Sequence, residues 1–208
     1  MSLLTCRHLS VSYDGKAVLS DLNFSVDEGD YLGIVGENGA GKSTLVKALL
    51  RLKKISGGEI VTADGFKPTE IGYLPQQTPV QKDFPASVRE IVLSGCLNRM
   101  GLRPFYSRRE KELAARNMER LNLAALAGHC YRELSGGQQQ RVAFIRCMCQ
   151  PFDFILLDEP FAGVDPIAVE DIQSIVATLK HKNIGVIITD HNVDETLAIT
   201  DRTYLLYE

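Results

Sequence analysis

The sequence predicts an α/β fold, in which a mostly parallel sheet follows an N-terminal antiparallel β region and is interrupted by an inserted helical subdomain. Strand-like apolar segments alternate with helical patterns over much of the chain, as in a parallel sheet covered on both faces. Helical patterns dominate from about residue 87 to 149. We therefore expect one domain over residues 1–208, with the helical subdomain inserted in its core.

The N-terminal elements begin with a predicted hairpin. Residues 4–13 and 18–26 alternate like strands and are joined by the turn sequence DGK. Residues 30–36 form a nearly continuous apolar run that ends at a glycine, as expected of a buried parallel strand. Two further short strands are expected at 58–64 and 70–76.

Helices are predicted from the 3.6-residue period and from capping residues. Over 43–52, the leucines at 45, 49 and 52 recur on one face. The segment 107–128 is rich in helix formers, and Ser107 with Glu110 predicts a capping box at its start. The remaining expected elements are helices at 87–95, from about Gly137, at 166–180 and at 192–199, and strands at 152–158, 184–189 and 203–208.

Composition limits the classes of ligand and of location. The chain has 208 residues with 23 basic and 26 acidic side chains, a formal charge of −3. This balance argues against nucleic acid as the main ligand, because backbone binding needs a concentrated basic face. No apolar run is long enough for a membrane span, the N-terminus is too polar for a secretory signal, and the five cysteines are scattered. We expect free thiols and a cytoplasmic protein that does not insert directly into the membrane.

The segment GENGAGKST at 36–44 fits the P-loop pattern G-x-x-x-x-G-K-[ST] between an apolar strand and an amphipathic helix. Glycines let backbone N–H groups wrap a phosphate. Lys42 places a positive charge between the β- and γ-phosphates, and the Ser43 hydroxyl can ligate Mg²⁺. We therefore predict that ATP and Mg²⁺ bind here. The expected nucleotide contacts are Asn38, Gly39, Ala40, Gly41, Lys42, Ser43 and Thr44.

Two adjacent acids follow the strand-like run FDFILL. Asp158 and Glu159 would lie at the carboxyl end of a strand, where ligands bind in open α/β sheets. Asp158 is the candidate second ligand of Mg²⁺. Glu159 can accept a proton from an attacking water or orient it. The alternative, that both acids only cap the turn at Pro160, stays open.

The stretch YRELSGGQQQRV at 131–142 places two glycines after a serine at the start of a predicted helix, which is a favourable place for an anion. Together, the P-loop, LSGGQ, LLDEP, GVD and a histidine after a later strand resemble, in that order, the ATPase subunits of ATP-binding-cassette (ABC) transporters. The resemblance covers essentially the whole chain.

The resemblance implies further roles. Tyr13 would stack on adenine, and Gln76, rather than Gln77, would sense Mg²⁺ and water. Asp165 would contact the opposite subunit, and His191 would touch the γ-phosphate, with Lys42 and Glu159 as the other catalytic residues. Two copies would pack head to tail, so that the signature loop of one covers the ATP held by the other. The signature residues are Ser135, Gly136, Gly137 and Gln138.

The resemblance also implies a transmembrane permease as partner and a peripheral position on the inner face of the cell membrane. Residues 71–95 are similar to ATPases that energise uptake of zinc, manganese or iron-siderophore substrates. Residues 84–95 are most similar to the metal branch, which predicts metal import. The C-terminal third is more similar to ATPases of lipopolysaccharide export and branched-chain amino-acid systems. The two resemblances meet near 149–153, so a hybrid origin is a hypothesis. The chain ends at TYLLYE where family members usually continue, which predicts a truncated or minimal domain.

Overall fold

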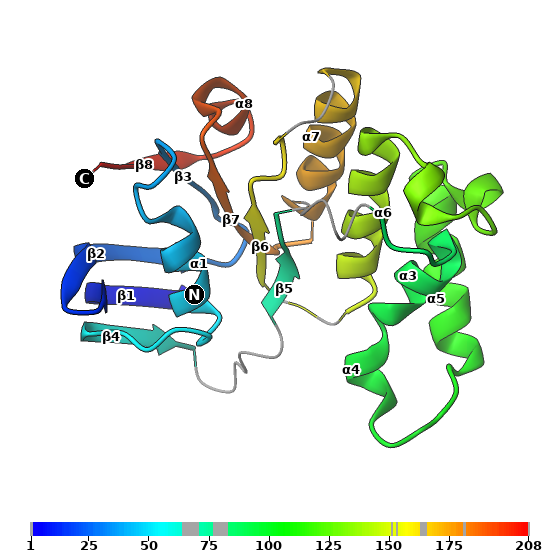
Figure 1. The fold of residues 1–208 in the computed structure, drawn as a ribbon, viewed down its shortest axis with the longest axis horizontal. Helices are drawn as coiled ribbons and strands as arrows, with labels where there is room; N and C mark the ends of the chain where they lie inside the picture. The colour runs from blue at the N-terminus through cyan, green and yellow to red at the C-terminus, as the bar shows by residue number, and fades with distance from the viewer. Residues whose placement is uncertain are drawn as a thin grey trace. The chain divides into compact units, whose positions relative to one another are not determined.

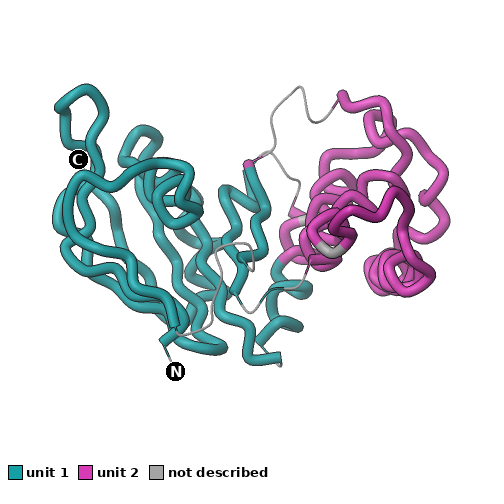
Figure 2. Tube along the Cα trace, turned by 90° about the horizontal axis from the view of Figure 1, so that it is seen from below, with its two compact units in different colours: residues 1–75, 152–162, 173–208 teal, residues 76–151, 163–172 magenta. Residues whose placement is uncertain are grey.

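The computed structural model describes residues 2–63, 71–76, 83–150, 152, 154–162, 166–180 and 182–207. The chain folds as two compact units, coloured separately in Figure 2. Unit 1 comprises residues 1–75, 152–162 and 173–208, and unit 2 comprises 76–151 and 163–172.

The antiparallel layer of unit 1 is built on the predicted hairpin. Strand β1 (Ser2–Tyr13) pairs with β2 (Lys16–Asp27) on one side and with β4 (Gly57–Thr62) on the other, both antiparallel. The turn between β1 and β2 is closed by the pair of Tyr13 and Lys16. Figure 1 shows these three strands as one layer.

A five-stranded parallel sheet forms the rest of the framework of unit 1, in the order β5-β6-β7-β3-β8. Every residue of the three central strands is buried, which explains their continuous apolar sequences. The carboxyl ends of neighbouring parallel strands lie at one edge, so the segments that follow β3, β6 and β7 meet there. The strands are β3 (Tyr31–Gly36), β5 (Ile71–Leu74), β6 (Phe154–Asp158), β7 (Gly185–Asp190) and β8 (Arg202–Leu206).

Helix α1 (Lys42–Leu49) is shorter than predicted, and the expectation that Leu52 belongs to its apolar face is wrong. Arg51 has a φ of 58°, and the backbone N–H groups of Leu52 and Lys53 both donate to the carbonyl of Lys47, at 2.8 and 3.1 Å. This closing turn reverses the chain, and Leu52 is 73% exposed. Leu45 and Leu49 lie in the core as expected.

Two further helices complete the description of the C-terminal third. Helix α7 spans Pro166–Lys180, as predicted, and α8 spans Val193–Leu197. Asn192 caps α8 by accepting the N–H of Glu195 at 3.5 Å.

Unit 2 contains the first part of α7 (residues 166–172) and four further helices, with short 3₁₀ turns at Ala124–Leu126 and Tyr131–Glu133. The four helices are α3 (Val88–Ser94), α4 (Leu97–Met100), α5 (Arg108–Arg120) and α6 (Gly136–Met148). The core of unit 2 is a separate apolar cluster to which α3, α5 and α6 contribute. Members of this cluster include Val88, Val92, Ala114, Met118, Val142 and Ile145.

The capping box predicted at the start of α5 is confirmed. The Ser107 hydroxyl accepts the N–H of Glu110 at 3.3 Å, and the Glu110 carboxylate accepts the N–H of Ser107 at 2.6 Å. The helix ends at Arg120 rather than continuing to 128, because Asn122 adopts a φ of 55° and stops it.

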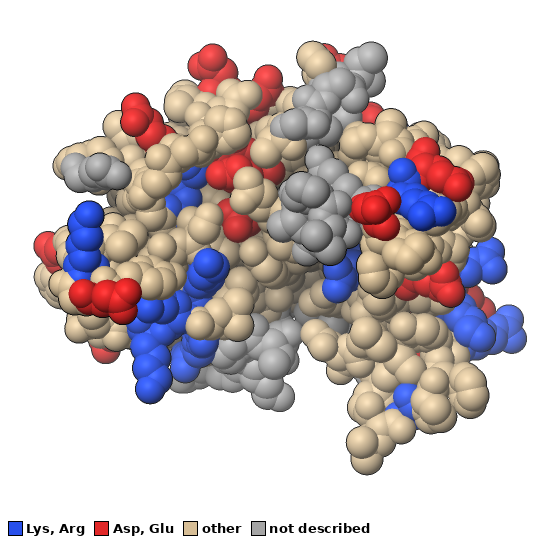
Figure 3. Space-filling view, in the orientation of Figure 1, with Lys and Arg blue, Asp and Glu red and all other residues tan. Residues whose placement is uncertain are grey.

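Charged side chains and cysteines are placed as follows. On the face drawn in Figure 3, basic side chains gather beside the antiparallel layer, with acidic ones close to them. None of the five cysteines, all of which the structure describes, forms a disulfide, as expected.

Across the described part of the chain, no helix has both the length and the apolar character that a bilayer crossing requires.

Candidate active site

The P-loop connects β3 to α1, and its backbone requires glycine. Gly39 and Gly41 have φ values of 100° and 95°, which L side chains rarely adopt. A Cβ on Gly41 would also lie 2.7 Å from a methyl group of Leu19. Glu37, Asn38 and Gly39 are exposed, while Ala40 is buried and Thr44 is half-buried. The loop is therefore a pre-shaped backbone cradle that opens to solvent.

Lys42 lies in the middle of this cradle. It is only 4% exposed, and its ammonium donates to the carbonyls of Gly36 at 2.6 Å and Glu37 at 2.9 Å. These two carbonyls hold the ammonium of Lys42 against the loop. A phosphate oxygen can replace either carbonyl as acceptor or accept a further hydrogen bond from the ammonium. Ser43, the next residue, is exposed, as a hydroxyl that reaches a bound cation must be.

Asp158 ends β6 and is buried, at 5% exposure. Burial raises the pKa of its carboxyl above the ordinary value, and hydrogen bonds from Thr189 and Tyr73 and the charge of Lys42 oppose that rise. Oxygen atoms of this kind suit Mg²⁺. In proteins this ion binds to few side-chain oxygens, and phosphate oxygens and water complete its coordination shell. Asp158 and the Ser43 hydroxyl supply such oxygens. Among the described residues, no group of three or more His, Cys, Asp or Glu side chains could hold a metal by itself.

Glu159 adopts an uncommon backbone conformation directly after Asp158. Its φ is 48°, and its N–H donates to the carbonyl of Thr189 at 2.7 Å, which holds the turn against β7. A non-glycine residue in this region costs on the order of 1–3 kcal/mol and is found preferentially at functional sites. The side chain is 10% exposed, and its carboxylate lies 3.9 Å from Nδ1 of His191. Two of the three predicted catalytic side chains, Glu159 and His191, are therefore neighbours.

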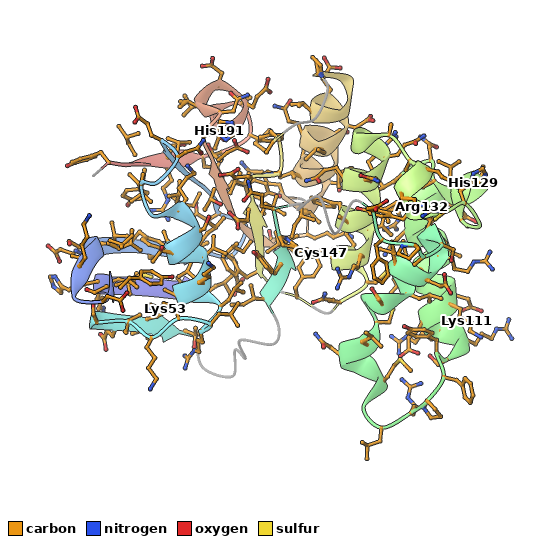
Figure 4. The ribbon with its side chains drawn as sticks, viewed as in Figure 1. Lys53, Lys111, His129, Arg132, Cys147 and His191 are labelled. Carbon is orange, nitrogen blue, oxygen red and sulfur yellow. The ribbon has the colours of Figure 1, made fainter. Side chains whose placement is uncertain are left out.

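His191 follows β7 and is held by Asp190, which is fully buried. One carboxylate oxygen of Asp190 accepts the N–H groups of His191 at 2.8 Å and Asn192 at 2.9 Å, and it lies 3.4 Å from the imidazole Nδ1. The other oxygen accepts the N–H of Phe161 at 3.3 Å. Asp190 thus ties the segment after Glu159 to the segment that carries His191. The imidazole, labelled in Figure 4, is about half exposed, so a ligand can reach it.

Tyr13 ends β1 and is 38% exposed. The ammonium of Lys53, labelled in Figure 4, lies 3.6 Å from the centre of its ring, in a cation–π contact. Tyr13 thus offers an aromatic surface in unit 1, and one cation already contacts it.

The signature loop belongs to unit 2 and caps helix α6. The Ser135 hydroxyl accepts the N–H of Gln138 at 3.3 Å, and the Gln138 side chain accepts the N–H of Ser135 at 3.0 Å, which forms a second capping box. Ser135 and Gly136 are exposed, and Gly137 is buried. A serine hydroxyl that accepts one hydrogen bond can still donate another. The loop can therefore donate to a ligand without breaking its own cap.

The family model for ABC transporters matches residues 19–162. The chain belongs to the family of ABC transporter ATP-binding proteins. Members of this family bind ATP and hydrolyse it to power transport, and they work with transmembrane permease subunits. This ABC ATPase therefore has the fold class and the enzymatic activity that the sequence predicted.

Two curated relatives differ in the substance transported. The manganese transport ATP-binding protein of Bacillus subtilis is 38% identical and matches 96% of this chain and 81% of its own length. The lipopolysaccharide export ATP-binding protein of Haemophilus influenzae is also 38% identical and matches 99% of this chain and 87% of its own. Both matches extend over nearly the whole ABC ATPase, so the division of resemblance near 149–153 stays a prediction.

A solved structure with the same fold is an inward-facing transporter described as of the metal-chelate type. It matches this ABC ATPase with a TM-score of 0.87 at 29% identity, over 99% of this chain and 80% of its own.

The other predicted residues are placed as follows. Gln76 follows β5 and is exposed, and it belongs to unit 2. Gln77 and Asp165 lie outside the described residues. Sequence reasoning gave no role to Tyr73, Thr189 or Asp190, which hold Asp158 and His191. A signal for Asp190 was its position, since it is a charged residue at the end of an apolar strand and directly before the histidine.

Tyr13 provides a direct test of adenine stacking. Replacing Tyr13 with Leu should weaken ATP binding about 5- to 100-fold, because stacking of a base on an aromatic ring is worth about 1–3 kcal/mol. Tyr13→Phe keeps the ring and should bind nearly normally. Titration with a fluorescent ATP analogue measures both variants. Equal affinities of the Leu and Phe variants would exclude the stacking role.

Proposed function

We propose that this ABC ATPase powers the import of a divalent metal ion, manganese or zinc. The observation that carries the proposal is the segment 71–95, whose sequence is similar to ATPases of metal uptake and which includes β5, Gln76 and α3. The manganese transport relative and the metal-chelate transporter structure support it.

A second candidate is the export of lipopolysaccharide or another lipid, with amino-acid transport as a variant of the same resemblance. It is favoured by the segments LLDEPFAGVDP and ITDHNVDET, and by the export relative of equal identity. These segments contain Glu159 and His191, so their similarity is evidence about ATP hydrolysis more than about the transported substance. For this reason, we place metal import first.

The test is reconstitution of the ATPase with the permease that copurifies with it. For metal import, ATP on the ATPase side should drive Mn²⁺ or Zn²⁺ across liposomes toward that side, and a Glu159→Gln complex should not. ATP hydrolysis that is stimulated by lipopolysaccharide, without any movement of metal, would instead establish export.

The proposed hydrolysis follows from the geometry of unit 1. Glu159 accepts a proton from the attacking water or orients it, while Lys42 and His191 hold the γ-phosphate oxygens. Asp158 and Ser43 would hold Mg²⁺, and the ion would neutralise phosphate charge. The neighbouring positions of Glu159 and His191 support this arrangement.

The active form proposed here is a head-to-tail homodimer on the cytoplasmic face of the membrane, bound to its permease. Each ATP lies between the P-loop of one copy and residues 135–138 of the other, and Asp165 contacts the opposite copy. The exposed start of α6 supports this proposal, because a helix N-terminus with exposed N–H groups favours an anion.

Gly136 allows the dimer to be tested without disturbing the fold. Gly136 is the exposed first residue of α6, where an acidic side chain stabilises a helix. Gly136→Asp should therefore fold normally but repel the γ-phosphate and abolish turnover. Gly136→Asn adds the same bulk without the charge and should lose much less activity than Gly136→Asp.

Mixing this variant with Lys42→Ala should restore activity. In a mixed dimer, one composite site carries both changes and the other carries neither. An equal mixture should recover about a quarter of the normal rate if the sites are independent. Phosphate release measures the recovery. A mixture that stays inactive at every ratio would mean that the P-loop and the signature loop of one chain act on the same ATP.

A further inference from the structure

The carboxylate of Asp158 is held from both sides by hydroxyl groups of the neighbouring strands. Thr189 on β7 lies opposite Asp158 in register, and its Oγ1 donates to Oδ1 at 2.8 Å. Tyr73 on β5 pairs with Leu156, two residues before Asp158, and its hydroxyl donates to Oδ2 at 3.3 Å. Each carboxylate oxygen thus accepts one hydrogen bond from a hydroxyl group.

The two hydroxyls restrict the orientation of the carboxylate but leave it able to bind a cation. Each carboxylate oxygen has two lone pairs, so one hydrogen bond to each leaves acceptor capacity on both. Thr189 is fully buried, and Tyr73 is partly buried and packs against the main apolar core of unit 1. Neighbours packed in this way fix the plane of the carboxylate before any ligand arrives.

Tyr73 connects Asp158 to a second predicted site residue. It lies on β5, which among the described strands pairs only with β6, and β5 is followed within three residues by Gln76. A shift of β5 would therefore move the hydroxyl of Tyr73 relative to Asp158.

We propose that Tyr73 is a positioning residue, whose hydroxyl, together with that of Thr189, orients Asp158 for the Mg²⁺ of the bound nucleotide. This rests on the proposed role of Asp158 in holding that ion. A packing role would use the ring of Tyr73, whereas positioning uses its hydroxyl.

The test is Tyr73→Phe, which removes only the hydroxyl. The dissociation constant of ATP is measured with Mg²⁺ and again with EDTA. We expect the affinity in EDTA to be unchanged and the gain in affinity from Mg²⁺ to fall on the order of tenfold, as for loss of one hydrogen bond to a charged group. Thr189→Val should act in the same direction, and Thr189→Ser, which keeps the hydroxyl, should restore the gain.

Tyr31→Phe is the matched control. The hydroxyl of Tyr31 donates to the carbonyl of Val176 at 2.7 Å, so this variant also loses one tyrosine hydrogen bond in unit 1. It should lower the melting temperature without changing the Mg²⁺ gain. A Tyr73→Phe variant with a normal Mg²⁺ gain would overturn the proposal.

Asp158→Asn separates that outcome from failure of the proposed function. If Asp158→Asn leaves the Mg²⁺ gain intact, Asp158 does not hold the ion. If Asp158→Asn abolishes the gain and Tyr73→Phe does not reduce it, only the positioning role fails.

Discussion

Glu159→Gln is expected to stop ATP turnover while ATP binding stays normal. The amide keeps the size of the side chain but cannot accept a proton as the carboxylate does, and loss of such a group costs on the order of 10²–10⁴-fold in rate. The carboxylate is 10% exposed and 3.9 Å from Nδ1 of His191, which is predicted to touch the γ-phosphate. Phosphate release at saturating ATP measures the rate, and equilibrium titration measures binding.

Because ATP binds but is not consumed, this variant should also accumulate as an ATP-bound dimer, which light scattering detects. Glu28→Gln, the same chemical change in an exposed turn of unit 1, is the control and should be fully active. Turnover of the Glu159 variant within a few-fold of normal would remove Glu159 from the mechanism.

Lys42→Met should nearly abolish ATP binding. The variant keeps an apolar side chain of similar length but loses the buried ammonium, which makes charge-assisted contacts worth about 1.5–3 kcal/mol each. The loss in affinity should reach on the order of 100-fold. Isothermal titration measures it, and Lys54→Met, an exposed lysine of the same unit, is the matched control.

Loss of the ammonium also leaves the carbonyls of Gly36 and Glu37 without that donor. The melting temperature without nucleotide therefore reports damage to the loop separately from lost binding. A stable Lys42→Met protein that binds ATP with normal affinity would contradict the role given to this lysine.

The features that the sequence predicted well are local. The P-loop is contiguous, and its glycines at 39 and 41 adopt the backbone that the pattern requires. The Ser107–Glu110 capping box could be predicted because both partners lie within one turn. The Ser135–Gln138 box has the related signal S-x-x-Q, but its two glycines also fit an anion site, so the pattern predicts two roles for the same residues.

The features that were missed depend on which strands are neighbours. Tyr73 and Thr189 reach Asp158 only because β5 and β7 flank β6, and no local pattern gives that order. The early end of α1 was missed for a different reason. Leu52 fits the apolar period, but the backbone bonds to Lys47 end the helix before that residue.

The buried carboxylate of Asp190 gives the site a shared support. The N–H of Phe161, two residues beyond Glu159, and the N–H groups of His191 and Asn192 all donate to this one side chain. Residues that share one hydrogen-bonding partner are energetically coupled, and substitutions among them are not additive. In evolutionary terms, a substitution in the segment after Glu159 alters which substitutions the segment that carries His191 can accept. The reverse also holds.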